Sequence, residues 1–269
     1  MNRRWMPMAA VLVCAAFALR SLGLIDATSL WADELYSVGK SFQPSYGDLL
    51  AQLRQDTHPP LYYSLLWVWG GVVGQSGLSL RLLSWLAYGI GGLLMAAQAK
   101  ALAPAPQQRS ALLLAALMAF CSPYPLRFSL EGKSYALLTA LVALAWWWRR
   151  RRQPALYGLS VLLASLTHFY GLFLFAATAC WDAAQRRGSL ATAASLALLP
   201  SLAWIAYAWD YLFSSSAAAW IGRPDFALLE ETLARALGPW PLPKLGLILM
   251  VLWALRRRGL AAADEAQQP

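Results

Sequence analysis

Long apolar stretches separated by short arginine clusters restrict what this chain can fold into. Of its 269 residues, 59% are hydrophobic and only 13% are charged, which is too apolar for a soluble domain. About 20 consecutive apolar residues cross a bilayer as a helix, in which the backbone satisfies its own hydrogen bonds. The sequence therefore predicts an all-α, polytopic membrane protein, with residues 1–269 forming a single membrane domain surrounded by membrane lipids.

Positive charge is concentrated between the apolar stretches. The clusters lie at 3–4, 149–152, 186–187 and 256–258. Loops rich in Lys and Arg stay on the cytoplasmic side, so topology accounts for the formal charge of +9 and nucleic-acid binding is not expected. The alanine- and arginine-rich composition is typical of a GC-rich bacterium. We therefore expect a multi-pass protein of a bacterial inner (plasma) membrane, with both termini cytoplasmic.

Placing the arginine clusters inside predicts about eight transmembrane helices. In order they are 5–24, 78–102, 110–125, 135–148, two short helices in a tight hairpin within 154–182, 190–213 and 244–255. Two outer segments remain, 26–77 and 214–243. The stretch 61–73 is shorter than the ~20 residues of a span, so we interpret it as an interfacial helix. The alternative, a crossing at 61–73, would put 149–152 outside. The second outer segment contains an amphipathic helix, 225–237.

Four short polar motifs fall on the predicted outer side. They are Trp31-Ala-Asp33-Glu34, Asp56-Thr57-His58-Pro-Pro-Leu-Tyr62-Tyr63, Arg127-Phe-Ser-Leu-Glu131-Gly-Lys133-Ser-Tyr135 and Thr167-His168-Phe-Tyr170. The third lies in a short outer turn predicted at 126–134. The chain has only two histidines, and both belong to these motifs. Four independent features on one surface indicate a functional site.

Each motif also has a purely structural interpretation. Asp33 and Glu34 can begin a helix, where acids complement the helix dipole. His58, which precedes two prolines, can be a turn residue, and His168 can be a hydrogen-bonded interfacial residue. Glu131 can form a local ion pair with Arg127 or Lys133 on a surface turn. Arg127 and Lys133 can extend their charges to the membrane surface while their stems stay in apolar surroundings. The joint occurrence of all four motifs favours the functional interpretation.

In their order along the chain, the motifs resemble those of polyprenyl-phosphate-dependent glycosyltransferases of the GT-C fold. This group includes protein O-mannosyltransferases and the aminoarabinose transferases that modify lipid A. The resemblance covers about residues 5–185. It implies a GT-C-like fold and transfer of a sugar from a polyprenyl-phosphate donor to an acceptor at the extracytoplasmic face; undecaprenyl phosphate is the expected bacterial carrier. The third motif departs from the family, because it has Gly132-Lys133 where Ala-Arg is common.

The resemblance also implies roles for individual residues. Asp33 matches the acidic residue of the first outer loop and would be the general base. Glu131 matches the second acidic position, and His58 lies in the donor-side His-Pro-Pro motif. The other polar or aromatic motif members are candidates for substrate binding: Glu34, Tyr62, Tyr135, His168 and Tyr170.

The chemistry of sugar transfer supports these roles independently of the resemblance. Moving a sugar from a phosphate to a hydroxyl requires a base for the incoming proton and cations for the departing phosphate. Arg81, Arg127 and Lys133 lie near the predicted outer ends of spans and are the candidate cations, since guanidinium and ammonium groups bind phosphate. The isoprenoid tail would occupy an apolar groove between helices.

Two other interpretations stay open. One is a non-catalytic lipid-handling protein, such as a polyprenyl-lipid flippase or an accessory subunit. A transporter places ionisable groups at mid-span depth, however, and the predicted spans have almost none there. The other is a half-enzyme that needs a partner chain, because members of the family continue through further spans. A divalent metal is also left open, without a close-spaced ligand motif; the candidate ligands are Asp33, Glu34, His58 and His168.

Overall fold

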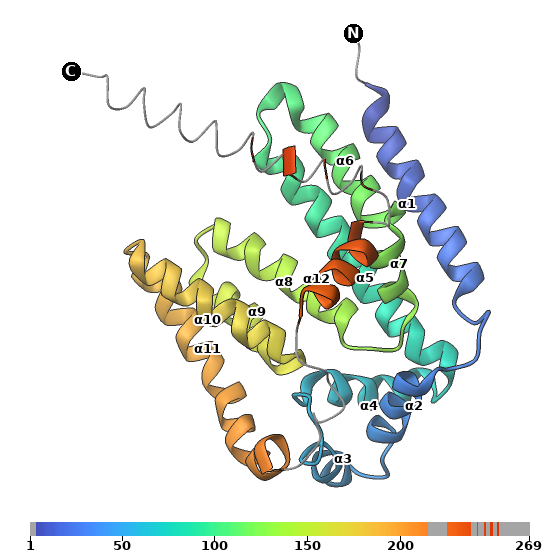
Figure 1. The fold of residues 1–269 in the computed structure, drawn as a ribbon, viewed down its shortest axis with the longest axis vertical. Coiled ribbons are helices and arrows are strands. Elements are labelled where there is room, and N and C mark those ends of the chain that lie inside the picture. Colours follow the sequence, from blue (N-terminus) through green and yellow to red (C-terminus); the bar gives the residue numbers. More distant parts are fainter. Residues whose placement is uncertain are drawn as a thin grey trace. The chain divides into compact units, whose positions relative to one another are not determined.

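The computed structural model describes residues 4–214, residues 225–237 and a few isolated positions after them. The described residues form helices and turns with no strand among them, which confirms the predicted all-α fold (Figure 1). The chain divides into two compact units, Met1–Ala218 and Ala219–Pro269, and each is described by itself. All four sequence motifs belong to the first unit.

Three helices of the first unit are long and apolar enough to cross a membrane. They are α1 (Trp5–Leu24), α5 (Gly77–Leu102) and α11 (Gly188–Tyr207). The first two match their predicted spans to within one residue. Three such helices in one chain are typical of a helical membrane protein.

Glycine and serine set the boundary between α5 and the helix before it, α4 (Leu61–Val73). Gly74 follows α4 with a φ of 104°, a conformation that glycine adopts readily. Ser76 then caps α5, because its Oγ accepts the backbone N–H of Ser79 at 3.1 Å. With 13 residues, α4 has the bounds predicted for the interfacial helix and is shorter than a span.

Four further helices that the sequence predicts to cross the membrane are shorter than ~20 residues. They are α6 (Gln108–Cys121), α8 (Tyr135–Arg150), α9 (Pro154–Thr167) and α10 (Phe169–Ala184). The pair α9 and α10 confirms two short helices within 154–182, with His168 between them. The total of about eight spans stays a prediction, and most of the last one, 244–255, lies outside the described residues.

The structure corrects the segment between the third and fourth predicted spans. The sequence predicted one helix over 110–125 and a turn at 126–134, but α6 ends early and a separate helix, α7 (Pro123–Leu130), follows. Pro123 has no backbone N–H, and the residue before a proline is pushed out of the helical region. Ser122 accordingly adopts an extended conformation, with φ −73° and ψ 130°. The turn that carries the third motif is therefore shorter than predicted.

The predicted outer segment 26–77 contains two more helices besides α4. They are α2 (Ala32–Ser41) and α3 (Tyr46–Leu53). The Ser45 Oγ accepts the N–H of Asp48 at 3.1 Å and caps α3. Both acids of the first motif lie in the first turn of α2.

The last described helices are one that is shorter than predicted and one that agrees with its prediction. The span predicted over 190–213 is shorter in the structure, because α11 gives way to a π-helical turn, Asp210–Ser214. In the second unit, α12 (Phe226–Leu237) confirms the helix predicted over 225–237. The Asp225 carboxylate accepts the N–H of Leu228 at 2.8 Å and caps this helix.

The long helices of the first unit pack side by side. α5 packs on α6 and α8, α8 packs on α9, and α9 packs on α10 and α11 (Figure 1). Small residues allow this close approach. A Cβ added to Gly91 of α5 would lie 3.0 Å from the Cα of Ala140 in α8. A Cβ added to Gly171 of α10 would lie 2.5 Å from the carbonyl oxygen of Ala164 in α9.

The bundle has two chemically distinct ends. α8 runs from Tyr135 to Arg150, and α9 returns to the turn at His168. The motif residues therefore lie at one end, and the arginine clusters 149–152 and 186–187 lie at the other. The topology predicted from the arginine clusters requires this separation.

Candidate functional site

The first motif is anchored by an ion pair between Glu34 and Arg81, both of which are buried. The Arg81 Nε donates to Glu34 Oε1 at 2.8 Å, and its Nη2 donates to Oε2 at 2.7 Å. The backbone N–H groups of Gly132 and Trp31 also donate to this carboxylate, at 2.8 and 3.3 Å. Burial opposes ionisation, but these donors outweigh it and hold the pKa of Glu34 below its usual range.

Every N–H of the Arg81 guanidinium has an acceptor. Besides its bonds to Glu34, Arg81 donates to the carbonyl oxygens of Ile25, Thr28 and Ser29 at 2.9, 2.8 and 3.1 Å. A guanidinium has five N–H groups, so none remains for a phosphate in this structure. Arg81 and Glu34, which the sequence predicts to bind substrate, here join the segment after α1, the start of α2, α5 and the turn before α8.

Lys133 is a buried cation without an ion-pair partner. Its side chain lies in the turn between α7 and α8 and is only 7% exposed. Its Nζ forms no hydrogen bond or ion pair with any residue that the structure describes. Burial lowers the pKa of Lys133, and the carboxylates of Asp33, Asp56 and Glu131 oppose this effect. An ammonium group in such surroundings is suited to bind an anion.

Asp33 has a different environment from the adjacent Glu34. Its carboxylate is half-buried and makes no hydrogen bond or ion pair within the described part of the chain. Among the neighbouring acids it has the largest electrostatic effect on Lys133. The two acids of the first motif therefore differ, because Glu34 is bound within the protein while the Asp33 carboxylate is available to a ligand.

The second motif forms a network around Asp56. Its Oδ1 accepts hydrogen bonds from the Lys40 Nζ at 2.8 Å and from the Thr57 backbone N–H at 2.6 Å, and His58 Nδ1 lies 3.4 Å away. Burial opposes ionisation of Asp56, but His58 and Lys40 outweigh it and lower its pKa to about 2. Lys40 was missed by sequence reasoning, because nothing in its spacing connects it with Asp56.

His168 joins the second, third and fourth motifs. Its Nδ1 accepts the backbone N–H of Tyr170 at 3.1 Å, so the neutral ring carries its proton on Nε2. The ring centres of His58, Tyr135 and Tyr170 lie 5.4, 5.6 and 4.4 Å from that of His168. Burial, with the charges of His58 and Lys133, lowers the pKa of His168 to about 4. The ring is therefore neutral at pH 7.

Glu131 begins the turn after α7 and pairs with Arg127. The Arg127 Nε donates to Glu131 Oε1, and its guanidinium carbon lies 5.6 Å from the centre of the Trp31 ring. Burial raises the pKa of Glu131, and the neighbouring Glu34 and Asp33 carboxylates add to this, while Arg127 acts against it; the pKa stays above its usual range. The Arg127 side chain is 54% exposed, which leaves part of its guanidinium accessible to an anion.

The two tyrosines of the second motif have different surroundings. Tyr62, a predicted substrate contact, is fully buried in a core of leucines and packs there. Tyr63 is also buried, but its ring centre lies 6.1 Å from that of His58 and 5.6 Å from the Lys40 Nζ. Adjacent residues on a helix face different directions, and the sequence did not determine which of the two would face the charged groups.

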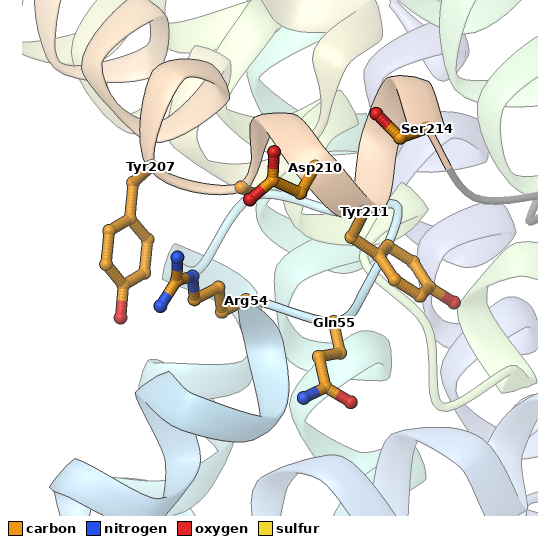
Figure 2. Close-up of a pocket in the computed structure, with 7 residues that line it drawn as sticks. Arg54, Gln55, Tyr207, Asp210, Tyr211 and Ser214 are labelled. Carbon is orange, nitrogen blue, oxygen red and sulfur yellow. The ribbon is translucent and has the colours of Figure 1, made fainter.

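A pocket of about 420 Å³ lies next to the second motif, between the end of α3 and the turn after α11. Figure 2 shows Arg54 and Gln55 on one side of it and Asp210 and Tyr211 on the other. The Arg54 guanidinium carbon lies 5.0 Å from the centre of the Tyr207 ring. Sequence reasoning missed this pocket, because its two sides are distant along the chain and neither carries a motif.

Of the candidate metal ligands, His58 and His168 have neighbouring rings, and Glu34 is paired with Arg81. Within residues 4–214 and 225–237, no group of three or more His, Cys, Asp or Glu side chains is arranged to hold a metal ion.

Comparisons of the chain with protein-family models, with curated proteins and with solved structures gave no match in any of the three.

Proposed function

We propose that this chain is a membrane glycosyltransferase that moves a sugar from a polyprenyl-phosphate donor to an acceptor at the extracytoplasmic face. One observation carries the proposal. Asp33 offers a carboxylate without a hydrogen bond in the described chain, and Lys133 offers a buried ammonium group without an ion pair there. A base and an anion-binding cation in one site are the two groups that the transfer requires.

The proposed reaction is a direct displacement at the anomeric carbon of the sugar. The acceptor hydroxyl forms the new carbon–oxygen bond and gives its proton to Asp33. The bond between the anomeric carbon and the phosphate oxygen breaks, and its electron pair stays on the phosphate. Lys133 and the accessible part of Arg127 stabilise that developing charge. Attack from the face opposite the phosphate inverts the configuration of the sugar.

The other site residues act mainly through position in this proposal. Glu34 and Arg81 fix the turn that carries Lys133, since the N–H of Gly132 donates to Glu34. His168 and His58 form the aromatic wall of the site together with Tyr135. Glu131 orients Arg127 through their ion pair.

Two cavities supply places for the rest of the substrates. An apolar cavity of about 420 Å³ between α5, α6 and α8 would hold part of the isoprenoid tail. Its lining includes Phe128, whose ring centre lies 5.1 Å from that of Tyr135 at the site. The pocket of Figure 2, beside the second motif, is the candidate entrance for the acceptor.

The test is donor turnover by bacterial membranes that contain the chain, which supply the unknown acceptor. Undecaprenyl-phospho-mannose and undecaprenyl-phospho-aminoarabinose would serve as donors, with release of undecaprenyl phosphate measured. Asp33→Asn should lower turnover about 100- to 10,000-fold, the usual contribution of a general base. Asp26→Asn is the matched control, because Asp26 is an exposed acid of the same outer segment and should leave turnover unchanged.

The same assay separates the proposal from its alternatives. Undiminished turnover by Asp33→Asn would remove Asp33 as the base. If wild-type membranes move the donor across the bilayer without releasing undecaprenyl phosphate, the chain is a lipid-handling protein instead. Turnover that appears only with a co-purifying second chain would identify a half-enzyme.

A further inference from the structure

The arginine end of the bundle contains a second polar arrangement that takes no part in the proposed reaction. Arg149, at the end of α8, donates from Nε and Nη2 to the two carboxylate oxygens of Asp182 at 2.8 and 2.5 Å. Asp182 is fully buried in α10, and Arg187 Nη1 lies 3.5 Å from the same carboxylate. This buried acid therefore ties the ends of α8 and α10 together.

The remaining arginines of the cluster 149–152 are not equivalent. The Arg151 guanidinium carbon lies 3.6 Å from the centre of the Trp147 ring, so Arg151 is stacked on the protein. Arg150 and Arg152 have no hydrogen bond from their side chains and no ion pair in the described part of the chain. Both are exposed, and both line the same pocket.

That pocket has a volume of about 470 Å³ and a lining with four arginines and no acid. The lining residues are Gln98, Leu102, Trp146, Arg149, Arg150, Arg152, Arg187 and Leu190. The Asp182 carboxylate pairs with Arg149 and Arg187 and neutralises part of this charge. α8 and α10 end here while α9 and α11 begin here, so helix-end charges of opposite sign offset each other. The side chains therefore leave the pocket strongly positive.

The turn that ends α8 positions Arg152 at the pocket. Arg152 has a φ of 53°, in the left-handed region that favours glycine at the end of a helix. Its N–H donates to the carbonyl of Arg149, and the N–H of Gln153 donates to that of Trp148, so this is a helix-ending turn. An arginine at such a position carries a conformational penalty that glycine would avoid.

We propose that this pocket binds the phosphate headgroup of an anionic phospholipid in the leaflet on the arginine side. Guanidinium groups bind phosphate oxygens through paired hydrogen bonds. Trp146, Leu102 and Leu190 add apolar walls, as expected where a headgroup meets acyl chains. Basic pockets between membrane helices on the cytoplasmic side are suited to anionic headgroups. α8 separates the pocket from the proposed transfer site by 16 residues, roughly 24 Å at about 1.5 Å per residue.

Native mass spectrometry of the full chain in detergent tests the proposal with phosphatidylglycerol as the probe. Wild-type protein should retain phosphatidylglycerol at least about tenfold more strongly than phosphatidylcholine. Arg150→Gln combined with Arg152→Gln should lower retention of phosphatidylglycerol by about tenfold or more, because charge-assisted hydrogen bonds are lost. Arg151→Gln is the control, since it removes one positive charge of the same cluster outside the pocket, and it should change retention less than twofold.

Three results would overturn the proposal. Equal retention of both lipids by wild-type protein would show that the negative headgroup is not selected, and this result needs no variant. Unchanged retention in the double variant, or an equal loss in Arg151→Gln, would place the lipid elsewhere. Displacement of phosphatidylglycerol by millimolar inorganic phosphate would identify a site for free phosphate. If the double variant does not fold, Arg150→Lys with Arg152→Lys keeps the charge, and a weaker retention than wild type is expected because the guanidinium fork is lost.

Discussion

At the scale of single residues, the site depends most on Arg81, which meets five acceptors from two segments, the residues after α1 and the start of α2. Arg81→Met would leave the Glu34 carboxylate buried without its cation. Removing one partner of a buried ion pair costs about 3–5 kcal/mol. We expect a large fall in the melting temperature of the protein in detergent.

Arg20→Met is the control for this substitution. Arg20 is exposed on α1 and forms no ion pair within the described residues, so its replacement should change stability by less than about 0.5 kcal/mol. Equal melting temperatures for Arg81→Met and Arg20→Met would show that the buried ion pair does not hold the site together.

A second residue-scale prediction concerns acid sensitivity. His168 has a pKa of about 4 in the folded protein, below the ordinary value near 6.5 that it regains on unfolding. Between these values the unfolded chain binds more protons, so His168 favours the folded state above pH 6.5 and loses this contribution as the pH falls toward 4. We expect the melting temperature in detergent to fall over this window. Asn at this position keeps a helix-capping oxygen but does not titrate, so His168→Asn should have a flatter pH dependence.

Asp56 affects acid sensitivity in a lower pH range than His168 does. Its pKa of about 2 lies below its unfolded value, so its contribution to stability is complete above about pH 4 and is lost only as the pH falls toward 2. Asp56→Asn should therefore alter how the melting temperature changes below pH 4. Its change between pH 6.5 and 4 should stay as in wild type. If the melting temperature of His168→Asn changes with pH as that of wild type does, His168 does not cause the loss of stability between pH 6.5 and 4.

At the scale of elements, the turn between α7 and α8 needs glycine at position 132. A Cβ there would lie 2.2–2.9 Å from three side-chain atoms of Leu80, which is fully buried in α5. The family resemblance leads one to expect alanine here, and the close approach of Leu80 explains glycine. Gly132→Ala should cost about 1–3 kcal/mol by overpacking and displace Lys133, so donor turnover should also fall.

Gly89→Ala is the matched control for the turn. No atom outside its own helix lies within 4 Å of an added Cβ at Gly89 of α5. The substitution should stabilise the helix by about 0.5–1 kcal/mol and leave turnover unchanged. A stable, fully active Gly132→Ala protein would show that the turn tolerates movement and does not position Lys133.

The elements also show what the sequence determined. Apolar length was sufficient to predict α4 and α5 closely, and the structure shows Gly74 and Ser76 at the boundary between them. The division of α6 from α7 was missed, although Pro123 marked it.

The motifs identified which segments meet, but not which side chain of each faces the site. Asp33 and Glu34 are adjacent in sequence, and only their partners in α5 and the turn before α8 distinguish an available acid from a bound one. The partners of Asp56 could not be predicted, because such pairs depend on packing between elements.

At the scale of the whole first unit, the separation of the motif end from the arginine end predicts a defined orientation in the membrane. The motif end should face outward and the arginine end should face the cytoplasm. Two exposed glutamines report on these ends, Gln52 on α3 and Gln153 beside the arginine cluster. Each would be replaced by cysteine in a chain whose natural Cys14, Cys121 and Cys180 are changed to serine. A membrane-impermeant maleimide should label Gln52→Cys in intact spheroplasts and Gln153→Cys only after permeabilisation.

The labelling pattern also decides the role of α4. If α4 lies along the membrane surface, three spans separate Gln52 from Gln153, namely α5, α6 and α8. Because this number is odd, the two positions are on opposite sides of the membrane. If α4 crosses, one further span is added and both positions are labelled in intact spheroplasts. Labelling of both would place the arginine cluster outside, against the retention of arginine-rich loops in the cytoplasm. It would also remove the phospholipid pocket from the cytoplasmic leaflet and place the turn of Lys133 on the side opposite Asp33, which contradicts the hydrogen bond from the Gly132 N–H to Glu34.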